Sequence, residues 1–73
     1  MAAKMKGVIK SVKKAEGFGF ITHVDTGMDH FFHKSSLEQT SRKEWEELEV
    51  NDRVVFTSID SPKGKRAIEV ASM

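Results

Sequence analysis

Two phenylalanines, two positions apart and each preceded by a glycine, are the residues of this sequence best suited to contact a flat ligand. In a β-strand Phe18 and Phe20 point to the same face, because side chains alternate, while Ile21 points to the other face. Glycine within a strand often marks a close approach of another backbone or of a ligand. Exposed rings near lysines suit the stacking of bases while phosphates pass alongside. The alternative is that both rings are ordinary core residues.

A second aromatic cluster occupies residues 29–33, which read Asp-His-Phe-Phe-His. Alternation puts Phe31 and His33 on one face of a strand and His30 and Phe32 on the other. If this strand pairs antiparallel with the first, Phe31 and His33 lie beside the first pair of phenylalanines. The result is a platform of four rings. Stacking on such rings contributes roughly 1–3 kcal/mol per base and tolerates any sequence.

Charge is distributed unevenly, although the net charge is only +1. The residues up to 23 hold five lysines and one acid, and residues 44–52 hold five acids and no base. The molecule is therefore expected to have a basic half and an acidic loop. We expect the acids to form a solvated face. The cations predicted to contact phosphates are Lys10 and Lys13, with Lys6 and Lys34 as further candidates.

The residue types do not support a metal site or catalysis. His30 and His33 are three apart on a predicted strand, so they point to opposite faces and cannot easily share an ion. The sequence has no cysteine and no paired carboxylate that would complete a site. No nucleophile has a base beside it. We therefore expect no metal, no cofactor and no enzymatic activity.

The elements that must position these residues are five short strands, expected over residues 5–13, 17–24, 28–33, 53–60 and 66–72. Turn signals separate them, and Gly17 is expected to take a positive φ. Residues 34–51 are expected to form a long loop with two short helical turns, the second preceded by capping-box spacing from Ser41 to Glu44. A five-stranded antiparallel Greek-key barrel of the oligonucleotide-binding type removes the exposed strand edges.

Length and composition limit the remaining possibilities. Seventy-three residues form one small domain, expected to span 1–73. The first residues lack the apolar run of a signal peptide, and no segment is apolar enough to span a bilayer. We therefore expect a cytoplasmic protein, without a membrane partner and monomeric.

The sequence resembles the cold-shock domain family, and two motifs carry this resemblance. Residues 14–21, Lys-Ala-Glu-Gly-Phe-Gly-Phe-Ile, look like that family's Lys-Gly-Phe-Gly-Phe-Ile motif, and residues 29–33 look like its Val-Phe-Val-His motif. The similarity continues in residues 6–10 and in Leu48-Glu49 with Val54 and Phe56, so it covers nearly the whole chain. It implies a five-stranded barrel that binds single-stranded RNA and DNA and acts as an RNA chaperone, affecting transcription termination and translation.

The sequence departs from the family pattern at several positions. Ser11 and Val12 stand where the family usually has Trp-Phe on its binding face, and Lys34 stands where it usually has Phe. Trp45 aligns with a family aromatic in the long loop, where it either stacks on a base or covers one end of the barrel. His30 replaces a core valine, as a buried hydrogen-bonded imidazole or at the rim of the barrel.

We therefore predict a protein that binds single-stranded RNA or DNA with low sequence specificity, more weakly and with more salt sensitivity than a full cold-shock platform. The alternative is a barrel of the same fold that acts as a protein-interaction module, which the missing aromatics and the acidic loop motivate. The residues predicted to bind nucleic acid are Lys10, Lys13, Phe18, Phe20, Phe31, His33, Lys34 and Trp45.

Overall fold

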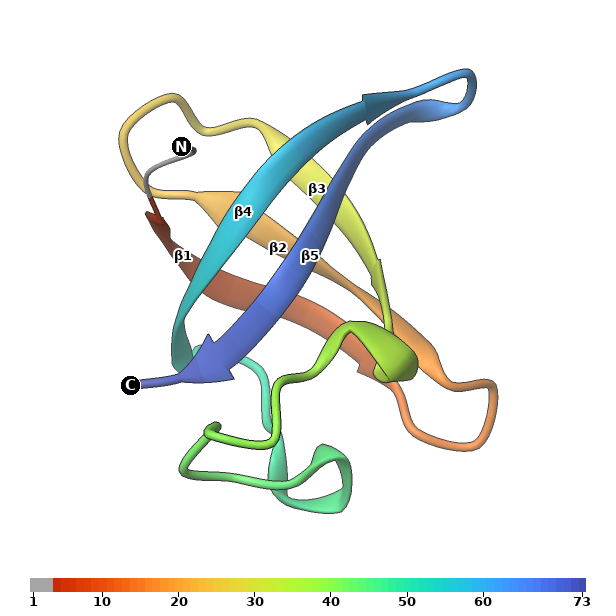
Figure 1. The fold of residues 1–73 in the computed structure, drawn as a ribbon, viewed down its shortest axis with the longest axis vertical. Coiled ribbons are helices and arrows are strands. Elements are labelled where there is room, and N and C mark those ends of the chain that lie inside the picture. The colour runs from red at the N-terminus through yellow and green to blue at the C-terminus, as the bar shows by residue number, and fades with distance from the viewer. Residues whose placement is uncertain (1–3) are drawn as a thin grey trace.

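Five strands close into a single barrel in the computed structural model, which describes residues 4–73. The order around the barrel is β1-β2-β3-β5-β4. Figure 1 shows β4 and β5 crossing in front of the layer made by the first three strands, with the loop after β3 gathered below one end. The strands are β1 (Met5–Lys13), β2 (Phe18–His23), β3 (Asp29–His33), β4 (Arg53–Ser61) and β5 (Gly64–Ser72).

The predicted five-stranded barrel is confirmed, with one difference in strand direction. Four neighbouring pairs are antiparallel, but β3 and β5 run parallel. This follows from closure of an odd number of strands. Directions that alternate from β1 through β2 to β3, and from β1 through β4 to β5, leave β3 and β5 pointing the same way.

Every second residue of a strand points into the barrel, because successive side chains point to opposite faces. Ile9, Ile21 and Phe32 are fully buried, and the last two lie on the faces opposite the platform rings, as predicted. Burial of side chains of this size contributes about 1.5–3 kcal/mol each. The rest of the apolar core is Trp45, Leu48, Val54, Phe56, Ala67 and Val70.

Gly19 faces this interior and makes room for the Phe32 ring opposite it in β3. A Cβ atom built at Gly19 would lie 2.5 Å from the carbonyl oxygen of Ser11 and 2.8 Å from the edge of the Phe32 ring. The close approach that the glycine indicated is therefore an approach of the barrel's own strands and core. Gly17, in the turn before β2, has φ 82°, as predicted.

A bulge in β1 determines which side chains this strand turns outward. Ile9 pairs with Ile21, but the next pair along the strand is Ser11 with Phe20, so Lys10 is an extra residue. Lys10 and Ser11 consequently both lie on the outer side, and Val12 packs against the core. Bulges of this kind commonly re-aim side chains at functional edges.

The segment between β3 and β4 contains two short 3-10 helices, η1 (Lys34–Ser36) and η2 (Trp45–Glu47). The predicted helical turns are present, but the predicted cap at Ser41 is wrong. The Ser41 hydroxyl instead donates to the Lys43 carbonyl and accepts from the backbone N–H of Ser72. The carboxylate of Glu47 accepts from the backbone N–H of Glu44, so the cap begins at Glu44.

An ion pair within this loop holds Asp52, the residue before β4, in place. The Asp52 carboxylate accepts from the Lys43 ammonium and the Glu49 backbone N–H, both at 2.9 Å. The Lys43 hydrogen bond, and then the Glu49 N–H, hold the pKa of Asp52 below its usual value. The Asp52 carbonyl also accepts from the N–H of Ile9 at the start of the β1 bulge. The loop is therefore tied to the strand that carries Lys10.

We expect Gly19→Ala to lower the free energy of unfolding by about 1–3 kcal/mol, because the added methyl overpacks a filled interior. Urea unfolding followed by the fluorescence of Trp45 measures this change. The control is Ser11→Ala on the neighbouring strand, which should change stability by less than about 0.5 kcal/mol. Equal stability of the glycine variant and the original protein would show that β1 and β2 separate freely enough to accept the methyl.

Candidate nucleic-acid interface

The paired strands β2 and β3 bring four rings together on the outside of the barrel. Phe20 pairs with Phe31, and Phe18 pairs with His33, in one antiparallel register. All four side chains are half-buried, whereas their strand neighbours Ile21 and Phe32 are fully buried. The platform predicted from alternation is therefore present as a contiguous outer surface.

The three phenylalanines of the platform contact one another in defined orientations. Phe18 and Phe31 stack with centroids 5.5 Å apart and planes 27° apart. Phe20 meets both rings edge to face, at 6.3 Å from Phe18 and 5.8 Å from Phe31. Such contacts are favourable aromatic geometries, so the rings support one another without being withdrawn into the core.

His33 is held in place by the first turn of η1. Its Nδ1 accepts from the backbone N–H of Ser35 at 3.1 Å and lies 2.9 Å from the Ser35 hydroxyl. Since Nδ1 is an acceptor in this arrangement, the ring proton of the neutral form is on Nε2. The imidazole therefore has a fixed orientation at the end of the platform.

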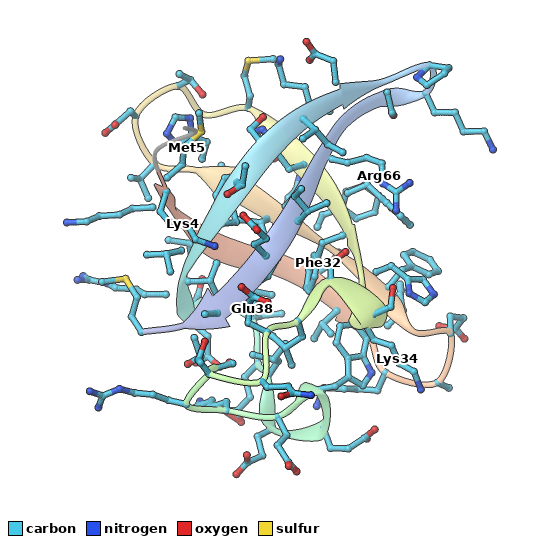
Figure 2. The ribbon with its side chains drawn as sticks, viewed as in Figure 1. Lys4, Met5, Phe32, Lys34, Glu38 and Arg66 are labelled. Carbon is cyan, nitrogen blue, oxygen red and sulfur yellow. The ribbon has the colours of Figure 1, made fainter. Side chains whose placement is uncertain are left out.

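Two exposed lysines flank the platform. Lys13 pairs in register with Phe18, and the backbone N–H of Lys34 donates to the Gly17 carbonyl at 2.8 Å. Within residues 4–73, neither ammonium makes an ion pair. Figure 2 shows Lys34 pointing outward near the end of β3. Both cations are free to meet a phosphate.

Lys10 occupies the expected outer position but is already paired. Its ammonium lies 2.6 Å from the carboxylate of Asp29, which also accepts from the Thr22 hydroxyl at 2.8 Å. The Lys10 hydrogen bond, and then the Thr22 hydroxyl, keep the pKa of Asp29 below its usual value. The carboxylate is thus ionised near neutral pH and competes with any phosphate for this lysine. Lys6 lies elsewhere, in a second hollow that it lines with Arg53.

Trp45 is part of the core rather than of the platform. It is 7% exposed, and its ring meets Phe32 edge to face at 5.6 Å. The indole N–H donates to the carbonyl of Lys14 at 3.2 Å. Of the two interpretations of Trp45, the structure supports a cover for one end of the barrel. A ring this buried has almost no face to offer a base.

His30 is 2% exposed and points into the barrel. Its Nδ1 donates to the carbonyl of Met28 at 3.2 Å, and its Nε2 lies 2.9 Å from the Ser58 hydroxyl. Both ring nitrogens are therefore satisfied, as for the buried hydrogen-bonded imidazole considered from the sequence. Among residues 4–73, no group of three or more His, Cys, Asp or Glu side chains is arranged to hold a metal ion.

The hairpin between β4 and β5 extends the platform with residues that the sequence analysis missed. Phe20 and Phe31 form one wall of a groove of about 570 Å³ whose other lining residues come from this hairpin: Ser61, Pro62, Lys63, Lys65 and Arg66. Arg66 lies opposite Phe31 in the parallel register between β3 and β5. A signal was present in the sequence, because residues 63–66 contain three cations in four positions.

The predicted acidic surface is exposed and lies outside this region. Glu44, Glu46, Glu47 and Glu49 are all exposed on the loop that contains η2. None of them lines the groove beside the platform. A closed five-stranded barrel with outward rings on β2 and β3, flanked by cations, defines the class of oligonucleotide-binding barrels.

Comparison with known proteins gives the family within this class. The family described as the 'Cold-shock' DNA-binding domain matches residues 5–73. The chain therefore belongs to the cold-shock domain family. This family consists of nucleic-acid-binding domains without enzymatic activity, and nucleic-acid binding is the function of this chain.

Individual relatives match along nearly their whole length. The chain is similar to the cold shock-like protein CspJ of Salmonella typhi, with 34% identity over all of both chains. It is 36% identical to the cold shock-like protein CspI of Escherichia coli K12, again over all of both chains. The major cold shock protein of Micrococcus luteus is 37% identical over 92% of this chain and 96% of its own.

A solved structure gives the same relationship in three dimensions. The chain superimposes on Drosophila Unr CSD456 with a TM-score of 0.75 and 33% identity, over 99% of this chain and 27% of that one. None of the helices in residues 4–73 has the length and apolar character needed to cross a membrane.

We expect Asp29→Asn to tighten binding of a short single-stranded DNA by a few-fold at low salt, because the change releases Lys10 for a phosphate. One more phosphate contact should also steepen the dependence of log K on log salt by about 0.7. Fluorescence anisotropy of a labelled oligonucleotide at several salt concentrations measures both quantities. The control is Asp25→Asn in the nearby turn, which should leave the slope unchanged. Weaker binding by Asp29→Asn would mean that the carboxylate itself contacts the ligand.

Proposed function

We propose that the chain binds single-stranded RNA or DNA by stacking bases on Phe18, Phe20, Phe31 and His33. The observation that supports this most directly is the shared outer surface of these four side chains. Rings in this position remain in contact with water in the free protein, which is unfavourable unless a ligand covers them. Stacking on a π-face does not select a base, so low sequence specificity is expected at the platform itself.

Phosphates are proposed to contact Lys13 and Lys34, with Lys10 available once its ion pair with Asp29 opens. Trp45 is omitted from the proposed contacts because its ring is buried. Ser11 lies beside Phe20 without offering a ring, and Val12 faces the core. The platform is therefore smaller than the family pattern, and cation–phosphate contacts carry a larger share of the binding free energy. Binding should accordingly be weak and sensitive to salt.

The biological role that we propose is that of a cytoplasmic, monomeric RNA chaperone or regulator of transcription and translation. Weak, sequence-tolerant stacking is suited to this role, since such a protein must bind many transcripts and release them. The alternative of a protein-interaction module is not favoured, because the platform rings and their flanking cations would have no use in it. In that alternative, binding would depend on Glu46 and Glu47 and not on the rings.

We expect Phe31→Ala to weaken binding of a labelled heptathymidine by about 5- to 100-fold, since each stack contributes roughly 1–3 kcal/mol. Anisotropy titrations at about 50 and 200 mM salt, with the unmodified protein measured in parallel, test this. Lys13→Gln should weaken binding at low salt and reduce the salt slope by about 0.7. The paired change Glu46→Gln and Glu47→Gln is the control and should not weaken binding. Absence of binding by the unmodified protein, confirmed by gel shift, would reject the proposal.

We expect Ser11→Trp to tighten binding of the same oligonucleotide by about five-fold or more, because it adds a ring in register with Phe20. Ser11→Leu is the matched control. It adds apolar surface at the same place without a π-face, so it should produce a smaller gain. An equal gain from both variants would indicate that apolar contact, and not stacking, governs this edge of the platform.

A further inference from the structure

The groove between the platform and the β4–β5 hairpin has properties that base stacking alone does not require. Its volume of about 570 Å³ lies within the range of small-ligand sites. Its apolar lining comes from Phe20 and Phe31 of the platform and from Pro62 at the hairpin tip. A flat ring that enters from the platform would meet apolar surface from both of these parts of the chain.

Arg66 is placed at this groove with unused hydrogen-bonding capacity. Its Cζ lies 5.6 Å from the centroid of the Phe31 ring, a distance typical of cation–π contact. Its Nε is buried and has no hydrogen-bond partner within the described chain. A buried N–H without a partner is uncommon in native proteins, and a small movement of the Arg66 side chain toward an acceptor on a ligand would remove the cost of leaving it unpaired.

Neighbouring carboxylates do not neutralise Arg66. In the pairing of β4 with β5, Arg66 lies opposite Ile59, so Asp60 is one residue away from its partner position. The Asp60 carboxylate, however, accepts a hydrogen bond from the Lys65 ammonium at 2.6 Å. That hydrogen bond holds the pKa of Asp60 below its usual value. Asp29 is likewise engaged by Lys10. Across residues 4–73, Arg66 takes part in no ion pair, so its fork of N–H donors is available to a ligand.

We propose that this groove is a guanine-selective subsite at the end of the platform and that Arg66 reads the base. The proposal rests on the proposed function and adds base selectivity to it. Guanine presents two adjacent acceptors, O6 and N7, which match the arginine fork. Adenine replaces one of them with a donor, and thymine or uracil offers no such pair on that edge. A purine also covers more of the Phe20 and Pro62 surfaces than cytosine does. Lys63, exposed on the same hairpin, meets the phosphate of that nucleotide.

The test uses heptathymidine and a set of heptamers in which one dG replaces one dT at each position in turn. The heptamer with dG at the most favourable position should bind the unmodified protein about 5- to 100-fold more tightly than heptathymidine does. A heptamer with dA or dC at that position should bind no more tightly than heptathymidine. Arg66→Lys keeps the positive charge but loses the paired N–H donors of the guanidinium group, so it should abolish the dG preference and weaken the dG heptamer far more than heptathymidine. Lys63→Gln should weaken all heptamers equally.

The outcomes separate this inference from the proposed function. Binding of heptathymidine with no dG preference would overturn the guanine subsite and leave the platform intact. A dG preference that survives Arg66→Lys, or a stronger preference for dC, would overturn the assignment to Arg66 or to guanine. Equal weakening of all heptamers by Arg66→Lys would make Arg66 a phosphate contact and overturn the inference. Failure to bind any heptamer would reject the platform itself. Thermal unfolding of each variant confirms that it is folded.

Discussion

The contact between the Phe32 ring and the backbone of β2 at Gly19 fixes how this small barrel divides its aromatic residues. Because the ring fills the interior at that point, β3 must turn Phe32 inward and Phe31 outward. The antiparallel register then places Phe31 beside Phe20 and aligns the remaining rings on the same outer surface. A wall one strand thick cannot place two successive side chains on the same side without a bulge. The outward orientation of the rings is therefore a geometric consequence of how the core is filled.

Closure of the barrel adds the second constraint, because it joins segments that are far apart in the chain. β5 must reach β3, and Figure 1 shows β5 crossing beside β3. The hairpin that precedes β5 thereby lines a groove together with Phe20 and Phe31. Arg66 thus lies against Phe31, and Figure 2 shows it on the outer side of the barrel. The basic turn at residues 63–66 gains its relevance only through this long-range pairing.

Much of the fold could be predicted from the sequence, because its main signals are local. Alternation identified the strands and the faces of Phe18, Phe20, Phe31 and His33, and turn residues separated the elements. The parallel pairing of β3 with β5 follows from the parity of five strands in a ring, so counting alone could have given it. The cap at Ser41 was mispredicted because its hydroxyl binds the distant N–H of Ser72, and local spacing carries no information about that partner.

The site was less predictable wherever a tertiary contact decides a residue's role. Lys10 has the right position, but its pairing with Asp29 depends on a bulge and on two strand registers. Trp45 could equally have covered the barrel or faced outward, and the carbonyl of Lys14 and the ring of Phe32 decide between these roles. The role of Arg66 depends on barrel closure and was missed. Sequence patterns specify which side of a strand a residue occupies, but not what that residue meets there.

The parallel junction of β3 and β5 has the fewest paired residues of any strand junction in the barrel. It consists of a single register pair, Phe31 with Arg66, and an isolated bridge between Leu37 and Val70. The junction of β4 and β5 has seven such pairs. Local opening of a small barrel starts where the fewest pairs must break. A nucleotide that contacts both sides of the β3–β5 junction binds only the closed form and so favours it by mass action. Ligand occupancy and resistance to local unfolding are in this way linked at one junction.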